Sequence, residues 1–144
     1  MVEGRNKKVM VFGVFDRLHP GHIYFLEQAG EHGEVIAVVA RDSFVRVLKK
    51  KMPALGEEFR IGMVKATALV KDAVLGDREL GSYRIVKDIQ PDIICLGYDQ
   101  EALEQDLMIH IKKGTIPAIP LIKLSSFRPH VFHSSFLDAV NPAL

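Results

Sequence analysis

Two histidines three residues apart mark the stretch of the sequence that is richest in possible chemistry. The stretch is GVFDRLHPGH, residues 13–22, in which His19 and His22 flank a Pro-Gly pair. Pro20 has a fixed φ and no N–H to lose, so His19 is predicted to be the N-cap of a helix and His22 to lie on its first turn. Residues three apart on a helix share a face. The imidazoles are therefore expected to flank a helix N-terminus with free backbone N–H groups, which favours a phosphate chain, and Gly21 adds no bulk there.

Two other interpretations of this histidine pair stay open. One is a helix cap beside an ordinary surface residue. The other is half of a metal site, because a second pair, His130 and His133, would complete the four ligands of a tetrahedral centre. The predicted position, between a strand and a helix of a parallel sheet, favours anion binding over both.

Length, charge and cysteine content limit the class of protein. A chain of 144 residues that is 48% hydrophobic is predicted to form a single domain, residues 1–144. Nineteen basic and eighteen acidic residues leave a formal charge of +1, which gives no indication of nucleic acid or membrane as a partner. The single cysteine, Cys95, fits a reducing compartment, so a cytoplasmic location is expected. Residues 1–8 lack the apolar region of a signal peptide, and no apolar run approaches the roughly 20 residues that span a bilayer.

Apolar runs of strand length recur along the chain and are separated by stretches with helical spacing. The runs are residues 9–15, 35–40, 72–76, 92–97 and 118–124. The predicted order of elements is βαβ(αα)βαβαβ, which indicates an α/β protein with a Rossmann-like parallel sheet and helices on both faces. One stretch, residues 57–70, is expected to be helical with a single apolar face made of Phe59, Met63, Ala66, Thr67 and Val70. Ligands of such sheets bind beyond the carboxyl ends of the strands.

Four motifs in order along the chain resemble those of a known family. GVFDRLHPGH resembles the G-x-F-D-x-x-H-x-G-H signature of the cytidylyltransferase-like nucleotidyltransferases. The segments that resemble the other three motifs are VARDSFVRVLKKKMPALGEEFRIGMV, PDIICLGYDQ and HSSFL. Taken together, they are most similar to those of the small archaeal FAD synthases, with glycerol-3-phosphate cytidylyltransferase as a close relative.

The resemblance implies a reaction and its substrates. A nucleoside triphosphate would bind at the turn after the first strand, and a phosphorylated acceptor would attack its α-phosphorus and expel pyrophosphate. The acceptor phosphate is already anionic near pH 7, because its second pKa is about 6, so no strong general base is needed. Cations and hydrogen-bond donors are expected to provide most of the catalysis. The family implies ATP and FMN as substrates, a divalent cation such as Mg²⁺ bridging phosphate oxygens, and a homodimer.

The resemblance also assigns roles to individual residues. The catalytic group is His19, His22 and Lys49. The nucleotide is expected to contact Gly13, Val14, Phe15, His19, Pro20, Gly21, His22, Asp99, Phe127, Ser134 and Ser135. Phosphate or acceptor contacts are expected from Arg41, Lys49, Lys51 and Arg60. The sequence departs from the family at two of these positions, since Val14 stands where a small hydroxyl residue is frequent and Phe127 where tyrosine is usual.

Each assignment has an ordinary structural alternative. The lysine cluster, residues 49–51, can also be a solvated loop, and for Lys50 this is the preferred interpretation. Arg60 has the spacing of a helix-surface residue paired with Glu57. Asp99 and the serines of HSSFL have the positions of helix caps.

The leading hypothesis is an archaeal-type FAD synthase that transfers AMP from ATP to FMN. The first alternative keeps the chemistry and changes the substrates to CTP with glycerol 3-phosphate or another polyol or sugar phosphate. The second alternative is a metal- or nucleotide-binding module that uses the two H-x-x-H pairs without catalysis.

Overall fold

Strands and helices alternate along the chain in the predicted order. The computed structural model describes residues 6–79 and 81–125. Its elements are β1 (Lys8–Gly13), α1 (Pro20–Gly30), β2 (Glu34–Val39), α2 (Asp42–Lys49), α3 (Glu57–Ala66), β3 (Asp72–Leu75), α4 (Arg84–Ile89), β4 (Ile93–Leu96), α5 (Glu101–Lys113) and β5 (Leu121–Lys123). The residues predicted to contribute from the C-terminal part of the chain lie outside the described residues; they are Phe127, His130, His133, Ser134 and Ser135.

The strands form one parallel sheet in the order β3-β2-β1-β4-β5. Strand β1 pairs with β2 along its whole length but pairs with β4 only at Val9↔Ile93 and Met10↔Ile94. The chain runs outward from β1 to β3, then crosses to β4 and β5 on the other side. Strand order therefore reverses between β1 and β4, which is where α/β sheets of this kind open a crevice for ligands.

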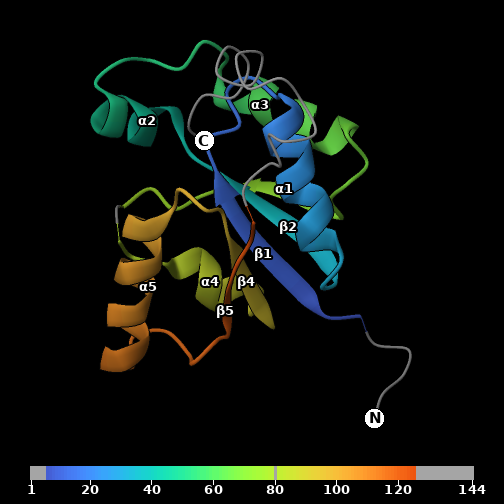
Figure 1. The fold of residues 1–144 in the computed structure, drawn as a ribbon. Coiled ribbons are helices and arrows are strands. Elements are labelled where there is room, and N and C mark those ends of the chain that lie inside the picture. The colour runs from blue at the N-terminus through green and yellow to red at the C-terminus, as the bar shows by residue number, and fades with distance from the viewer. Residues whose placement is uncertain (1–5, 80, 126–144) are drawn as a thin grey trace.

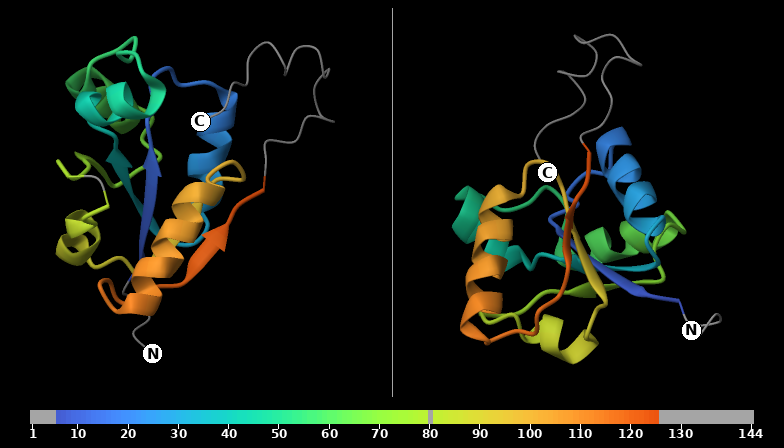
Figure 2. Two further views of the ribbon diagram at one scale, coloured as in Figure 1. Left: turned by 90° about the vertical axis from the view of Figure 1, so that its left-hand side faces the viewer. Right: turned by 60° about the horizontal axis from the view of Figure 1, so that its bottom comes forward.

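Helices cover both faces of the sheet (Figures 1 and 2). Alternate residues of β1 face opposite sides: Val9 belongs to the core cluster that includes Leu26 of α1 and Val64 of α3, and Met10 to the one that includes Leu107 of α5. Helix α2 lies beyond the carboxyl ends of the strands (Figure 2). Cys95 is fully buried in β4, as expected, and burial raises the pKa of its thiol to about 11. No helix within residues 6–79 and 81–125 has the length and apolar character needed to cross a bilayer.

Helix α3 buries a different face from the one that the sequence predicted. The prediction placed Phe59 on the inner face, but this side chain is 58% exposed, and the helix ends at Ala66, before Val70. The buried residues are Arg60 and Val64, one turn apart. A hydrophobicity pattern places arginine on the exposed face of a helix. It cannot predict a buried arginine, because it does not detect the backbone carbonyl groups that accept its hydrogen bonds.

Candidate active site

Helix α1 begins at the histidine pair as predicted. Pro20 is its first residue and His19 its N-cap. The two histidines cap the helix reciprocally, since Nδ1 of His19 accepts from the N–H of Gly21 at 3.1 Å and Nδ1 of His22 accepts from the N–H of His19 at 3.2 Å. Their ring centroids are 3.8 Å apart. The imidazoles thus lie together at the carboxyl end of β1, beside the point where strand order reverses.

The backbone N–H groups of the first turn are not free, which corrects one expectation from the sequence. The N–H of Gly21 is taken by the His19 ring, and those of His22 and Ile23 donate to the His19 carbonyl at 2.9 and 3.2 Å. Pro20 has no N–H to offer. A phosphate at this helix end would therefore depend on side-chain donors and the helix dipole.

His19 retains one donor for a ligand. Because its Nδ1 accepts a hydrogen bond, the proton of the neutral ring lies on Nε2. This Nε2 is buried and has no hydrogen-bond partner among the described residues. Burial also lowers the pKa of His19 below its usual value, which keeps the ring neutral. A buried donor without a partner costs about 1–3 kcal/mol, so this N–H is a candidate contact for a ligand.

His22 stabilises the position of His19 and does not offer a positive charge to a ligand. It is 5% exposed, and its ring lies 5.6 Å from that of Phe15. Burial is the largest cause that lowers its pKa to about 3, a protonated His19 and Lys49 add to the effect, and a hydrogen bond to the backbone of Arg17 opposes it. Both histidines are therefore neutral near pH 7. The pair acts through hydrogen bonds and leaves positive charge to other residues.

The Phe15 side chain is buried beneath the turn that connects β1 to α1 and does not lie on its surface. This turn, residues 13–19, is called the strand-one turn below. Phe15 is 2% exposed and adopts a left-handed backbone conformation with φ 54°. A Cβ on Gly13 would lie 2.6 Å from the Cε2 atom of the Phe15 ring. A side chain at residue 13 would therefore force this buried ring to shift. The expectation that Phe15 lies along a nucleotide does not fit its burial; its ring supports His22.

Replacing Gly13 with alanine is expected to displace the Phe15 ring and, through it, His22. We expect turnover to fall at least tenfold. The free energy of unfolding should fall by about 1–3 kcal/mol, because the added methyl group overpacks the core. The matched control is Gly62→Ala in α3, where an added Cβ has no neighbour within 4 Å. This control should stabilise the fold by roughly 0.5–1 kcal/mol and leave turnover unchanged. Thermal unfolding and steady-state rates of both variants test the claim; equal behaviour of the two would contradict it.

A pocket of about 600 Å³ opens at the carboxyl edge of the sheet, on the side of α4 and α5. This volume is typical of sites for small organic molecules. Its apolar lining includes Phe12, Gly13, Val14, Val38, Ala40, Phe44, Val47, Ile85 and Leu103. Gly13 and Val14 belong to the strand-one turn that leads to His19, so this turn separates the pocket from the start of α1.

Three cationic side chains line the pocket: Arg41, Lys49 and Arg78. Arg41 is anchored, because its Nε donates to the carbonyl of Gly76 at 2.8 Å. Lys49 lies close enough to the histidine pair for its charge to lower the pKa of His22. Lys51 is exposed and does not belong to the described pocket lining. Of the three lysines in the cluster, Lys49 is therefore the one that belongs to the described pocket lining.

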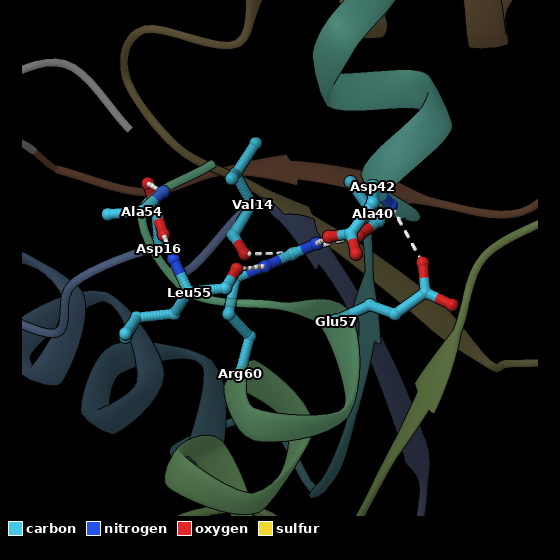
Figure 3. A network of polar contacts seen from close by, with 8 residues as sticks. All are labelled: Val14, Asp16, Ala40, Asp42, Ala54, Leu55, Glu57 and Arg60. Atoms are coloured by element: carbon cyan, nitrogen blue, oxygen red, sulfur yellow. Dashed lines mark hydrogen bonds and ion pairs between the residues drawn. The ribbon is translucent and has the colours of Figure 1, made fainter. Parts of the chain in front are cut away.

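Arg60 is fully buried at the meeting point of four segments (Figure 3). The guanidinium group donates to the carbonyls of Val14, Ala40 and Leu55 at 2.7–2.9 Å and to the Asp42 carboxylate at 2.6 Å. The alternative of a helix-surface residue paired with Glu57 is therefore wrong. The expected phosphate contact does not fit these surroundings either, since every guanidinium nitrogen is engaged. Arg60 joins the turn after β1 to the end of β2, where the pocket opens.

Asp16 adds a second link in the same network, which the sequence reasoning missed. Its carboxylate accepts from the N–H groups of Ala54 and Leu55, both at 2.8 Å (Figure 3). These residues follow the lysine cluster, so Asp16 ties the segment after α2 to the motif that carries the histidines. The motif signature contained Asp16, but nothing in its sequence surroundings indicated a partner 38 residues away.

The site also contains polar residues that follow β3 and β4. Arg78 and Tyr83 line the pocket from the segment after β3. After β4, Asp99 is exposed, while the neighbouring Gln100 lines the pocket and is the N-cap residue of α5. Inspection of the residues that follow β3, by the rule already applied to β1, β2 and β4, would have found Arg78.

The fold and the site together define a class. A parallel sheet of order 3-2-1-4-5, a histidine pair at the first strand-to-helix turn and a pocket at the switch point are the features of a nucleotide-binding α/β protein. The chain belongs to the cytidylyltransferase-like family, whose model matches residues 10–118. This confirms the resemblance seen in the motifs.

Individual relatives narrow the comparison. The chain is 43% identical over 121 residues to an FAD synthase of Aciduliprofundum boonei, covering 83% of this chain and 79% of the relative. It is 45% identical over 121 residues to an FAD synthase of Methanosarcina barkeri, covering 81% and 85%. A similar solved structure is the lipopolysaccharide core biosynthesis protein from Thermoplasma volcanium, with a TM-score of 0.77 and 36% identity over 86% of this chain and 100% of that one.

Proposed function

We propose that this protein is an FAD synthase that transfers AMP from ATP to FMN and releases pyrophosphate. The observation that carries the proposal is the 43–45% identity to archaeal FAD synthases over 121 residues, a span long enough to include the histidine motif and the pocket-lining segments. The two alternatives are CTP-dependent transfer to a polyol phosphate and a module without catalysis.

The pocket supports a planar aromatic acceptor. Phe12, Phe44 and Tyr83 contribute aromatic side chains to its lining, and aromatic rings bind other rings by offset stacking or edge contacts. The isoalloxazine ring of FMN has the size and planarity for such a site, whereas glycerol 3-phosphate would leave the apolar surface uncovered. We infer that the flavin occupies this pocket and that its phosphate points toward the strand-one turn.

The chemistry that the residues support is an in-line displacement at the α-phosphorus. A phosphate oxygen of FMN forms the new P–O bond, the bond between the α-phosphorus and the oxygen that bridges to the β-phosphorus breaks, and pyrophosphate leaves with the electron pair. Nε2–H of His19 would donate to an oxygen whose charge grows in the transition state. Lys49 would hold two anionic groups near each other, because it lines the acceptor pocket and acts electrostatically on His22.

We propose that a divalent cation bridges phosphate oxygens of the substrate, as the family resemblance implies. Among the described residues no group of three or more His, Cys, Asp or Glu side chains is placed to bind a metal ion. Mg²⁺ commonly keeps most of its ligands from phosphates and water, so this arrangement fits Mg²⁺ that arrives with the triphosphate. When bound, the cation would neutralise charge on the phosphate oxygens.

Pyrophosphate release tests the proposal directly. The assay compares FMN with ATP, FMN with CTP, and glycerol 3-phosphate with CTP, each with Mg²⁺ at the same concentrations. Release only with FMN and ATP, with an equal amount of FAD, supports the proposal. Release only with glycerol 3-phosphate and CTP would show that these are the substrates, and the proposed site would stay the same. Absence of release in all three mixtures would reject FAD synthesis.

Lys49 and Lys50 provide a matched pair for testing the lysine cluster. Both side chains are exposed, but Lys49 lines the pocket, whereas Lys50 is the left-handed C-cap of α2 and does not belong to the described lining. We expect Lys49→Ala to raise KM for a phosphorylated substrate or to lower kcat, together at least tenfold in kcat/KM, because one phosphate loses its cation. Lys50→Ala should change kcat/KM less than twofold. If both substitutions have equal and negligible effects on steady-state kinetics, the lysine cluster is a solvated loop that contacts no substrate.

Three further features complete the proposal. We propose that residues 1–144 act as one nucleotidyltransferase domain, that the enzyme works in the cytoplasm, and that it forms a homodimer. The single cysteine supports the location. Sedimentation of the purified protein measures the oligomeric state.

A further inference from the structure

Strands β1 and β4 stop pairing before they end. Their bridges are Val9↔Ile93 and Met10↔Ile94, although β4 continues to Leu96 and β1 to Gly13. In a parallel ladder with this register, Phe12 faces Leu96, and the N–H of Gly97 is the partner of the Phe12 carbonyl. These two groups would close the sheet at the switch point by a direct hydrogen bond.

The side-chain amide of Gln100 takes the place of that bond. Its Oε1 accepts from the N–H of Gly97 at 2.8 Å, and its Nε2 donates to the carbonyl of Phe12 at 2.8 Å. One amide group is thus inserted between two backbone groups that would otherwise pair, and both remain satisfied. Gln100 and Phe12 both line the pocket. The insertion therefore lies in the wall of the cavity, at the point where strand order reverses.

We propose that Gln100 is a positioning residue that separates β1 from β4 and thereby keeps the acceptor pocket open. An amide is suited to this task because it carries a donor and an acceptor about as far apart as those of a peptide group. A side chain that can only donate, or only accept, would pair with just one of the two backbone groups, Gly97 N–H or the Phe12 carbonyl. The role in turnover rests on the proposed function, while the separation of the strands is a property of the protein without substrates.

The Gln100→Glu variant tests the donor half of the bridge. A carboxylate can accept from Gly97 but cannot donate to the Phe12 carbonyl, whereas a protonated carboxyl group can do both. Repulsion from that carbonyl raises the pKa of the new carboxyl group. We therefore expect KM for FMN to equal that of the wild type at the acidic end of the measurable range and to rise about tenfold above it as pH increases, the equivalent of one lost hydrogen bond.

The matched control is Gln105→Glu, at an exposed position on the same helix. It makes the same change of charge without touching either strand, so its ratio of KM to that of the wild type should stay constant with pH. The same constant ratio in Gln100→Glu would overturn the role of the amide donor. Gln100→Leu, which is of similar size but has no polar group, should raise KM about tenfold at every pH; a KM equal to that of the wild type would also overturn it.

A crystal structure of the Gln100→Ala variant tests the separation of the strands without reference to activity. We expect Gly97 N–H to bond directly to the Phe12 carbonyl and the pocket to narrow. An unchanged gap would overturn the proposal, whatever the kinetics show. If the strands close but the wild-type enzyme releases no pyrophosphate from FMN and ATP, the proposed function fails and the positioning role stands.

Discussion

Replacing His19 with alanine is expected to reduce turnover by about two to four powers of ten. The reason is the Nε2 donor of this ring, which is buried and has no hydrogen-bond partner among the described residues. If this N–H stabilises an oxygen of the pentacoordinate transition state, its loss raises the barrier without preventing substrate binding. The measurement is kcat and KM for both substrates, and the loss should fall mainly on kcat.

Alanine also removes the helix cap, so a second variant separates the two roles. Asparagine is among the best N-cap residues, so His19→Asn should keep the cap on Gly21 and restore thermal stability. It has no group at the position of Nε2, and turnover should stay as low as in His19→Ala. His32→Ala, just beyond the other end of α1, is the control that should retain normal rates. Near-normal turnover in His19→Ala would remove this imidazole from the mechanism.

Replacing Arg60 with methionine is expected to lower the free energy of unfolding by about 3–5 kcal/mol, a large part of the 5–15 kcal/mol of an ordinary domain. The substitution leaves the Asp42 carboxylate and three backbone carbonyls without the donors they have now. The melting temperature should fall by on the order of 10 °C. Activity should fall at temperatures where the variant is still folded, because Val14 and Ala40 carry the pocket wall.

Two variants make the prediction for Arg60 specific. Arg84→Met removes the same type of side chain from an exposed position and should change the melting temperature by no more than about 1–2 °C. Arg60→Lys keeps the charge but lacks the planar fork that reaches four oxygens from one side chain, so it should recover only a small part of the stability. Melting curves that are alike for Arg60→Met and Arg84→Met would show that the network contributes nothing to stability.

The order of elements was predictable because it depends on local properties. Buried parallel strands appear as continuous apolar runs, and amphipathic helices have a repeat that can be read along the chain. The N-cap at His19 followed from the conformational limits of Pro20 alone. The motif order was similarly available, and the family match over residues 10–118 confirms it.

The free N–H groups expected at α1 and the inner face expected for α3 were both wrong for a common reason. In each case a polar side chain bonds to backbone groups in a way that no periodicity reveals. The His19 ring takes the N–H of Gly21, and Arg60 enters the core because carbonyls from three other segments accept its hydrogen bonds. Burial of a charged group depends on partners that the sequence does not place next to it.

The sequence by itself determined the type of sheet, the position of the histidine pair and the family to which the chain belongs. Tertiary structure alone decided which lysine faces the pocket, which histidine keeps a donor, and how β1 and β4 are held apart by Gln100. The physical reason is one of range. Helix caps, turns and apolar repeats are set by residues a few positions apart, whereas the pocket and its hydrogen bonds join groups from strands that meet only after the chain has folded.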